Sequence, residues 1–458
     1  MRLIRYGIIG AGLAVAACGA QAAAGGRWAR NVPLTAQRYH PGTKFAFQAW
    51  APDGLRTNAA VYLLMELPVE LAQAKLSEMM SAGSIPPGLI VWNNPGNLPM
   101  KVRGAATRWM RASEYDQPGT EFPNFLVEEL VPAAAKALDV EISPSPEMHF
   151  VTGGSSGGIC AWNAAWHRND FFRRVYLASP TFSAMRGGEE PMTLLRKCET
   201  RPIRVFVTAG TVEPDSFFGD SFCVALNAVG AMEYAGYDCR FNLYDHEGHC
   251  THFADMGFWG EMMPWLFRGW RTNDVVKAGN PLRVRKLLAS GSRWEACDYR
   301  MPEPCREARS VDGGRLYSVA PDSRFVSADT LDGVGGRHGR FVLSALHLAW
   351  NARSVGGCAL AVLQDDRVLV ATDLGVQGVV SFGLTDVILP LPDDLPADNI
   401  TVVGTTLYAA SGKKVFRREL SVPAADSKRQ VAPSTPTYGD GYNYCREHLH
   451  RNGHPTVR

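Results

Sequence analysis

Three short stretches of the chain carry residue types that together can cleave an ester. The first, Gly153 to Gly157, reads Gly-Gly-Ser-Ser-Gly and fits the pattern G-x-S-x-G, in which a serine stands on a sharp turn between a strand and a helix. A serine hydroxyl is too weak an acid to attack an ester unaided. It needs a histidine to take its proton and a carboxylate to hold the imidazole in the right tautomer.

The predicted nucleophile is Ser155. A frame shifted by one residue, Gly154 to Gly158, would make Ser156 the nucleophile, but the frame on Ser155 leaves two glycines together at the tight helix start. The serine then stands at a helix N-terminus, where free N–H groups can receive a developing oxyanion. A plain glycine-rich turn or a phosphate loop is the alternative, because a single G-x-S-x-G also occurs by chance.

The predicted base is His249, in the second stretch, which runs from Asp245 to His252. His249 follows Gly248 just past the end of a predicted strand, so a tight turn can hold its ring. His246 and His252 are the alternatives, and they are more typical of a surface residue and a supporting residue.

The predicted acid is Glu213, in the third stretch, Ala209 to Asp215. It comes shortly after Gly210 and is preferred to Asp215 and Asp220, although a serine–histidine dyad without an acid stays open. The chain order serine, carboxylate, histidine is that of an α/β-hydrolase triad.

Apolar strand patterns alternate with helical patterns over residues 40–272, which predicts a mainly parallel, doubly wound α/β sheet with both faces covered. In such a sheet the site lies at the carboxyl ends of the strands, where all three stretches fall. Residues 23–45 are polar and predicted to be irregular. The predicted strands are 45–51, 61–65, 88–92, 148–152, 174–178, 203–208 and 239–244, and the predicted helices are 69–80, 122–138, 159–167, 221–234 and 256–270.

Length and composition limit the function classes. At 458 residues the chain suggests two domains, and 46% hydrophobic with 20% charged residues is typical of a globular protein. The net charge of +2 gives no reason to expect a nucleic-acid partner. The predicted partner is a small-molecule ester.

The N-terminus predicts export. A basic start and an apolar run from Ile8 to Ala17, shorter than the ~20 residues that span a bilayer, predict a signal peptide over residues 1–22. Val15 to Cys18 resembles a bacterial lipobox, in which Cys18 would be lipidated, whereas Ala20 to Ala22 is a competing cleavage site. The predicted location is periplasmic or extracellular, with membrane contact only through that lipid anchor.

The chain has ten cysteines. In an exported protein they could form disulfides, and buried free thiols are the alternative. The candidates that lie near one another in the sequence are Cys297 with Cys305, and Cys223 with Cys239 and Cys250. No C-x-x-C pair and no metal-ligand spacing occurs, so we predict no metal site and no cofactor.

Several motifs recur in order along the first domain. They are Asn94–Gly96, Arg111–Asp116, Phe125–Pro132, Gly153–Ala161, Leu194–Lys197, Pro202–Phe206 and Glu247–His249. Together they make residues 40–272 resemble the enterochelin-esterase-like branch of the α/β-hydrolases. The resemblance implies ester hydrolysis through Ser155 and His249.

The sequence departs from that branch where the predicted strand 61–65 ends. Relatives tend to carry Gln-Asp-Gly there, with a backbone N–H that serves the oxyanion hole, whereas this chain has Glu66-Leu67-Pro68. Pro68 has no N–H to donate, and Glu66 would bring a negative charge near an oxyanion. The predicted oxyanion donors are therefore the N–H groups of Leu67 and Ser156.

Two further departures concern the acid and the base. Glu213-Pro214 stands where relatives often have Asn-Asp, and Cys250 stands where relatives tend to have Asn after the histidine. A binding protein with a catalytically decayed esterase domain is therefore an alternative.

Beyond a predicted linker over 273–290, short strands alternate with glycine and aspartate turns, which favours an all-β domain over 291–420. Within that domain Asp373–Gln377, Thr406–Tyr408 and Lys414–Arg418 resemble the last part of the SMP-30/gluconolactonase family. That family forms β-propellers, and the segment has room for about three blades, so a partial propeller is predicted.

The resemblance makes a metal-dependent sugar lactonase an alternative function, although no aspartate occurs in Gly356–Ala359, where the family's metal-binding context would fall. An accessory domain that covers the esterase, binds substrate or mediates a homodimer is the preferred interpretation. Residues 421–458 are polar and predicted to be a disordered tail.

Overall fold

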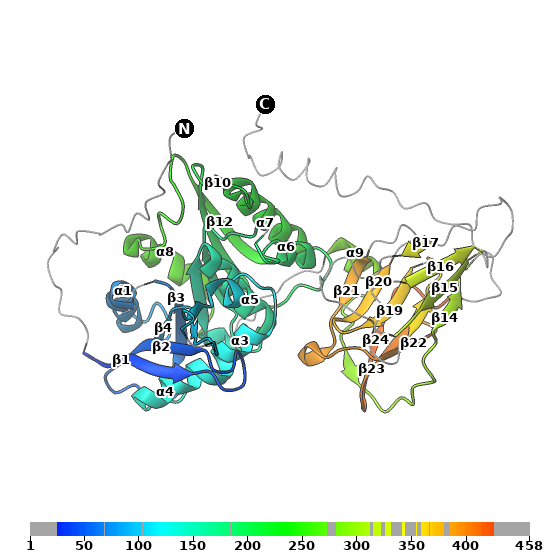
Figure 1. Ribbon diagram of the computed structural model, residues 1–458, viewed down its shortest axis with the longest axis horizontal. Coiled ribbons are helices and arrows are strands. Elements are labelled where there is room, and N and C mark those ends of the chain that lie inside the picture. Colours follow the sequence, from blue (N-terminus) through cyan, green and yellow to red (C-terminus); the bar gives the residue numbers. More distant parts are fainter. Residues whose placement is uncertain are drawn as a thin grey trace.

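A computed structural model describes residues 25–67, 69–102, 104–183, 185–272, 281–311, 315–321, 326–330, 341–343, 354, 359–365, 367–379 and 385–425. The predicted signal peptide with Cys18, part of the predicted linker, Gly356 to Cys358 and nearly all of the predicted tail lie outside the described residues. The remainder forms an N-terminal α/β part, residues 25–272, and a C-terminal β part, residues 281–425 (Figure 1).

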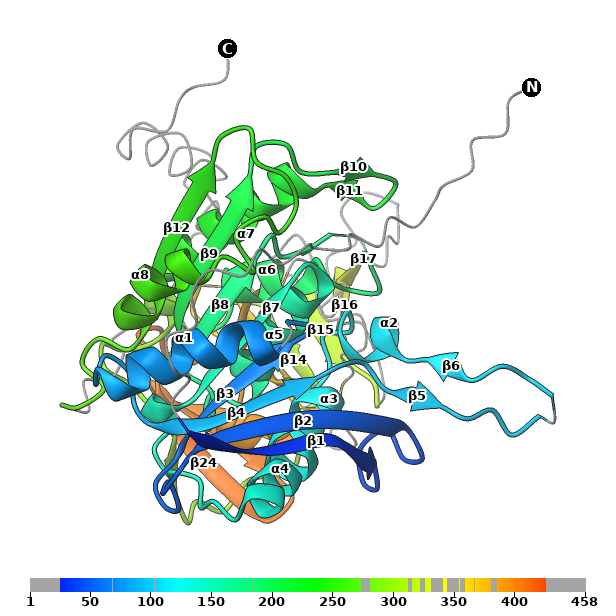
Figure 2. The same cartoon turned by 90° about the vertical axis from the view of Figure 1, so that its left-hand side faces the viewer.

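A single sheet organises the N-terminal part (Figure 2). Its strands are β1 Gly26–Thr35, β2 Lys44–Pro52, β3 Ala60–Met65, β4 Gly88–Asn93, β5 Asn97–Leu98, β6 Arg108–Trp109, β7 Phe150–Gly154, β8 Arg174–Ala178, β9 Arg204–Gly210 and β12 Asp238–Tyr244. The order is β12-β9-β8-β7-β3-β4-β2-β5-β6, and β1 pairs with β2. Neighbours from β12 to β4 run parallel, and β1, β2, β5 and β6 join by antiparallel pairing. The predicted α/β sheet is confirmed, and it is a mixed sheet, with parallel strands from β12 to β4 and antiparallel pairing at β1, β2, β5 and β6.

The strand β1 was not predicted, because residues 23–45 have no apolar pattern. No residue of β1 is buried, and its register against β2 shifts between Ala29 and Val32. β1 is therefore defined by its backbone pairing with β2, and no pattern of buried side chains predicts it from the sequence.

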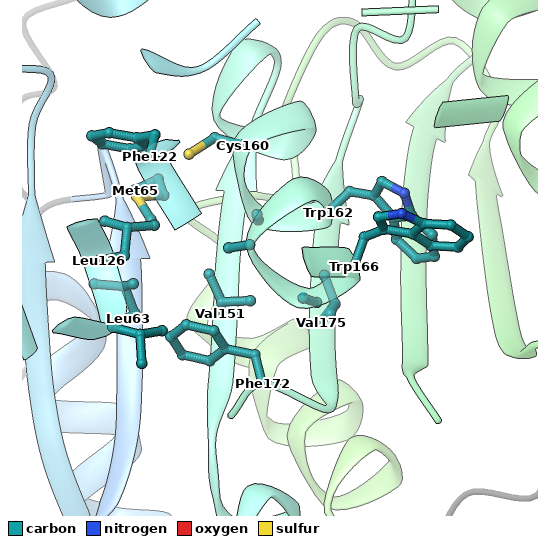
Figure 3. Packing of buried hydrophobic residues seen from close by; sticks show 14 of the residues in the cluster. Leu63, Met65, Phe122, Leu126, Val151, Cys160, Trp162, Trp166, Phe172 and Val175 are labelled. Atoms are coloured by element: carbon teal, nitrogen blue, oxygen red, sulfur yellow. The ribbon is translucent and has the colours of Figure 1, made fainter. Parts of the chain in front are cut away.

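Helices cover both faces of the sheet. One face carries α1 Val69–Ser81 and α8 Met256–Leu266. The other carries α3 Glu121–Phe125, a π-helical turn at Leu126–Leu130, α4 Val131–Leu138, α5 Ser156–His167 and α7 Ser221–Ala235. Side chains alternate along β3, so Leu63 packs with the second set of helices and Leu64 with the first. Figure 3 shows Leu63, Val151 and Val175 of three neighbouring strands in the layer shared with α5.

The C-terminal part holds helix α9 Leu282–Leu287, within the predicted linker, and three four-stranded antiparallel sheets. The sheets are β14-β15-β16-β17, β18-β19-β20-β21 and β13-β24-β23-β22. Their strands are β13 Glu295–Ala296, β14 Glu307–Arg309, β15 Arg315–Val319, β16 Val326–Thr330, β17 Phe341–Leu343, β18 Leu360–Val362, β19 Val368–Thr372, β20 Gly375–Val379, β21 Thr385–Leu389, β22 Asn399–Val403, β23 Thr406–Ser411 and β24 Lys414–Glu419. The predicted β-rich character of this part is confirmed, its sheets are antiparallel, and the propeller stays a prediction.

Ion pairs connect the two parts. Arg418 on β24 is almost wholly buried, binds both carboxylate oxygens of Glu199 in the N-terminal part, and donates to the Ser292 carbonyl at 2.8 Å. Arg201 binds Asp394 across the same boundary at 3.0 Å. The two parts are therefore held against each other by directional charged contacts.

We expect Arg418→Ala to lower the melting temperature clearly. Removing Arg418, whose side chain is 2% exposed, strips Glu199 of its partner and should cost about 3 kcal/mol. Arg417→Ala is the matched control, because that neighbour is 53% exposed and pairs with the exposed Glu295. Thermal unfolding followed by circular dichroism compares the two variants, and equal melting temperatures would contradict the expectation.

Candidate active site

The predicted nucleophile stands on a strained turn between β7 and α5. Ser155 has φ 56° and ψ −126°, which a non-glycine residue adopts only where its surroundings enforce it. Its N–H donates to the Ala178 carbonyl at 2.9 Å, and its Oγ forms a hydrogen bond with Thr181 Oγ1 at 3.0 Å. The turn therefore lifts the hydroxyl away from the strand and into contact with the loop after β8.

Gly153 allows that turn to close. A Cβ at Gly153 would lie 2.1 Å from the Gly157 carbonyl oxygen, so strand and helix come closer than any side chain permits. We expect Gly153→Ala to push α5 away from β7, lower the melting temperature by several degrees, and reduce any reaction at Ser155 more than tenfold. Gly119→Ala is the control, since nothing lies within 4 Å of a Cβ there. If the two variants melt and react alike, the close contact has no such role.

The predicted base and acid are in contact. His249 Nδ1 and Glu213 Oε2 lie 2.5 Å apart, and the Glu213 side chain is only 1% exposed. The Gly210 N–H donates to the other carboxylate oxygen at 3.2 Å. The carboxylate is thereby fixed at the end of β9 and directs the imidazole at the end of β12.

His249 and Glu213 each stabilise the charged form of the other. Burial lowers the pKa of His249, but hydrogen bonds to Cys250 and Glu213 outweigh that effect and raise the pKa to about 10. Burial raises the pKa of Glu213, but hydrogen bonds from His249, Ser179 and the Gly210 N–H outweigh it and lower the pKa below its usual value. The acid therefore stays ionised and stabilises an imidazolium at its side.

The histidine loop packs against the nucleophile turn. A Cβ at Gly154 would meet Cys250 Sγ at 3.0 Å, and the Cys250 N–H donates to Ser179 Oγ at 2.9 Å. Within the described part of the chain, no hydrogen bond joins Ser155 to His249, because the serine hydroxyl is turned toward Thr181. The structure thus brings the predicted acid and base together and sets the predicted nucleophile on an adjoining turn, and catalytic hydrogen bonds often tighten only when substrate is bound.

The alternative residues lie elsewhere. Asp215 is exposed on the strand β10 Asp215–Ser216, and Asp220 accepts hydrogen bonds from the first N–H groups of α7 as its N-cap. The His246 side chain is 89% exposed, and His252 stacks on Tyr244 with ring centroids 3.6 Å apart. In the described part of the chain, none of the four forms a hydrogen bond or ion pair with Glu213 or His249.

The two predicted oxyanion donors lie on neighbouring segments at the carboxyl edge of the sheet. Met65 pairs with Gly153, so the residues that follow β3 and β7 come side by side. Ser156 begins α5, and the first N–H groups of a helix have no intrahelical acceptor. The Leu67 N–H donates to no acceptor among the residues described, while Pro68 lies outside them.

Sequence reasoning missed Ser179 and Thr181. Ser179 links Glu213 to the Cys250 N–H, and Thr181 holds the Ser155 hydroxyl. Both follow β8 directly, at the same carboxyl edge as the three predicted residues. Two hydroxyl side chains just after a buried central strand were the signal that could have found them.

The described part of the chain has neither a cluster of metal-binding side chains nor a disulfide. It contains no group of three His, Cys, Asp or Glu side chains arranged to hold a metal ion. The seven cysteines that the structure describes, which include the predicted disulfide candidates, are all free. No helix among the described residues is long and apolar enough to cross a bilayer.

No family model matches the chain, and no curated protein matches it in sequence. Among solved structures, a ferulic acid esterase aligns with 53% of this chain and 98% of its own at 18% identity, with a TM-score of 0.40. The enterobactin esterase FES from Shigella flexneri aligns with 54% of this chain at 17% identity and a TM-score of 0.39, and the chain spans 59% of that protein's length. The feruloyl esterase module from Clostridium thermocellum aligns with 53% of this chain and 88% of its own at 13% identity, with a TM-score of 0.37.

Proposed function

We propose that this chain is an exported serine ester hydrolase. The observation that carries the proposal is the contact between His249 and a buried Glu213 beside a serine held at φ 56°. A buried carboxylate on a histidine, next to a strained serine on a strand-to-helix turn, is the arrangement that activates a serine hydroxyl. Export rests on the N-terminal sequence over residues 1–22.

In the proposed reaction, Ser155 Oγ bonds to the ester carbonyl carbon while His249 Nε2 takes the hydroxyl proton. The carbonyl oxygen becomes an oxyanion, which accepts from the N–H groups of Leu67 and Ser156. The alkoxide then leaves with the proton that the imidazolium returns. Water attacks the acyl-enzyme in the same way, which releases the acid and restores the serine, while Glu213 holds the imidazole throughout.

The substrate class is an ester of a small molecule. A siderophore ester, an acylated sugar and a simple aryl ester all fit the proposed chemistry, since any of them presents an ester carbonyl to the serine. A sugar lactonase activity of the C-terminal part has no comparable group of side chains among the residues described.

A fluorophosphonate probe tests the proposal directly. Folded wild-type protein should gain the mass of one probe per chain, and it should hydrolyse at least one member of a panel of p-nitrophenyl esters of increasing acyl length. A chelator in a parallel sample should leave both reactions unchanged, whereas it would abolish a metal-dependent lactonase. Folded protein that is neither labelled nor active would contradict the proposal and favour a binding protein.

A further inference from the structure

Glu66 lies where a negative charge would oppose the proposed oxyanion. It follows β3 directly and has φ 61°, a conformation that is unusual for a residue other than glycine. Its Oε2 would lie 3.6 Å from a Cβ built on Gly157, so the carboxylate stands beside the first turn of α5. A helix N-terminus attracts a carboxylate, but an oxyanion bound by Leu67 and Ser156 would need the same positive potential.

Arg111 binds this carboxylate through both of its oxygens. Arg111 Nε donates to Oε1 at 2.8 Å and Nη2 to Oε2 at 2.9 Å, and the two side chains are 24% and 26% exposed. The guanidinium also lies 6.0 Å from the Trp109 ring and 5.7 Å from the Tyr115 ring. This bidentate contact fixes the orientation of the Glu66 carboxylate and also compensates its charge.

Arg111 works among several acidic side chains. Glu114 is 2% exposed and accepts from the Gly96 N–H at 2.8 Å, and burial raises its pKa to about 7. Asp116 is 5% exposed and binds the Ser156 side chain; burial raises its pKa, although Arg111 and Arg186 oppose the rise. Without Arg111, the negative charge of Glu66 would stand uncompensated at the oxyanion loop.

We propose that Arg111 is a positioning residue of the hydrolase, which neutralises the carboxylate of Glu66 so that the oxyanion can form beside it. The inference rests on the proposed function. It explains how an acidic residue can occupy the loop that donates to an oxyanion. Arg111 is needed only because Glu66 carries a negative charge at this position.

A double-mutant cycle tests the pair, with the second-order rate constant of fluorophosphonate labelling as readout. Arg111→Met should slow labelling roughly tenfold to a hundredfold, because an unpaired carboxylate then faces the developing charge. Glu66→Gln alone should stay within about threefold of wild type, and adding it to Arg111→Met should restore most of the loss. Arg111→Lys keeps the positive charge but loses the bidentate contact, so its labelling rate should lie between those of wild type and Arg111→Met. Arg108→Met, on the exposed neighbouring strand, should change nothing.

The outcomes separate the two ideas. A wild type that does not react overturns the proposed function and this inference together. If the wild type reacts and Arg111→Met reacts equally fast, the inference alone is overturned. The same holds if the double variant Arg111→Met/Glu66→Gln reacts as slowly as Arg111→Met. Melting temperatures of all variants show whether a slow variant is folded, because a purely structural role predicts a loss that neutralising Glu66 cannot restore.

Discussion

Ser155→Ala is expected to reduce ester hydrolysis by at least about 10⁴-fold and to remove fluorophosphonate labelling completely. The hydroxyl is the only group at the strained turn that the proposed reaction uses as a nucleophile. Binding and the oxyanion donors remain in the variant, and they alone give only a small residual rate. Intact-mass spectrometry measures the labelling, and a p-nitrophenyl ester assay measures hydrolysis.

The variant should keep its fold. Alanine lacks only the hydroxyl that bonds to Thr181, while the backbone N–H of residue 155 still donates to the Ala178 carbonyl. Ser156→Ala is the informative comparison, because it keeps the backbone N–H at the start of α5 and loses only the side-chain contact with Asp116. It should still be labelled. Labelling that survives in Ser155→Ala and disappears in Ser156→Ala would assign the nucleophile to the shifted frame.

The central sheet could be predicted because its strands are buried on both faces. Every residue of β3, β7, β8 and β9 is buried, so each strand reads as a mostly apolar run bounded by turns. The strand β1 lacks that signal, and the two-residue strands β5 and β6 are too short to leave one. Pairing with a neighbour defines these strands, and a neighbour is not visible in a local pattern.

Only those residues of the candidate site that come shortly after a predicted strand could be predicted from the sequence. Ser155, Glu213 and His249 each come shortly after a predicted strand and a glycine, so their types and places suffice to propose them. The preference for Glu213 over Asp215 and Asp220 rested on its place shortly after Gly210, because the sequence does not show which carboxylate reaches the imidazole. The Arg111–Glu66 contact joins residues 45 apart in the chain, and no local pattern encodes such a pair.

Glu213→Gln is expected to lower the rate of hydrolysis by roughly 10³- to 10⁴-fold without unfolding the protein. In the proposed mechanism the Glu213 carboxylate accepts a hydrogen bond from the Nδ1–H of His249, so the lone pair of Nε2 is free to take the serine proton. A glutamine can offer its NH₂ group instead, which favours the wrong tautomer, and it no longer stabilises the imidazolium. Asp215→Asn is the matched control, because that carboxylate is exposed, whereas the carboxylate on His249 is that of Glu213.

The pH dependence of hydrolysis should also differ between wild type and Glu213→Gln. Only the neutral imidazole can take the serine proton, and the His249 pKa is raised to about 10, so the wild-type rate should still be increasing above pH 8. Glu213 is one of the groups that raise that pKa, so the midpoint in Glu213→Gln should move to lower pH while the plateau falls. Rate–pH profiles between pH 6 and 10.5 measure both changes. An unchanged midpoint with an unchanged plateau would mean that Glu213 does not act on the base, and the serine–histidine dyad would then be the better mechanism.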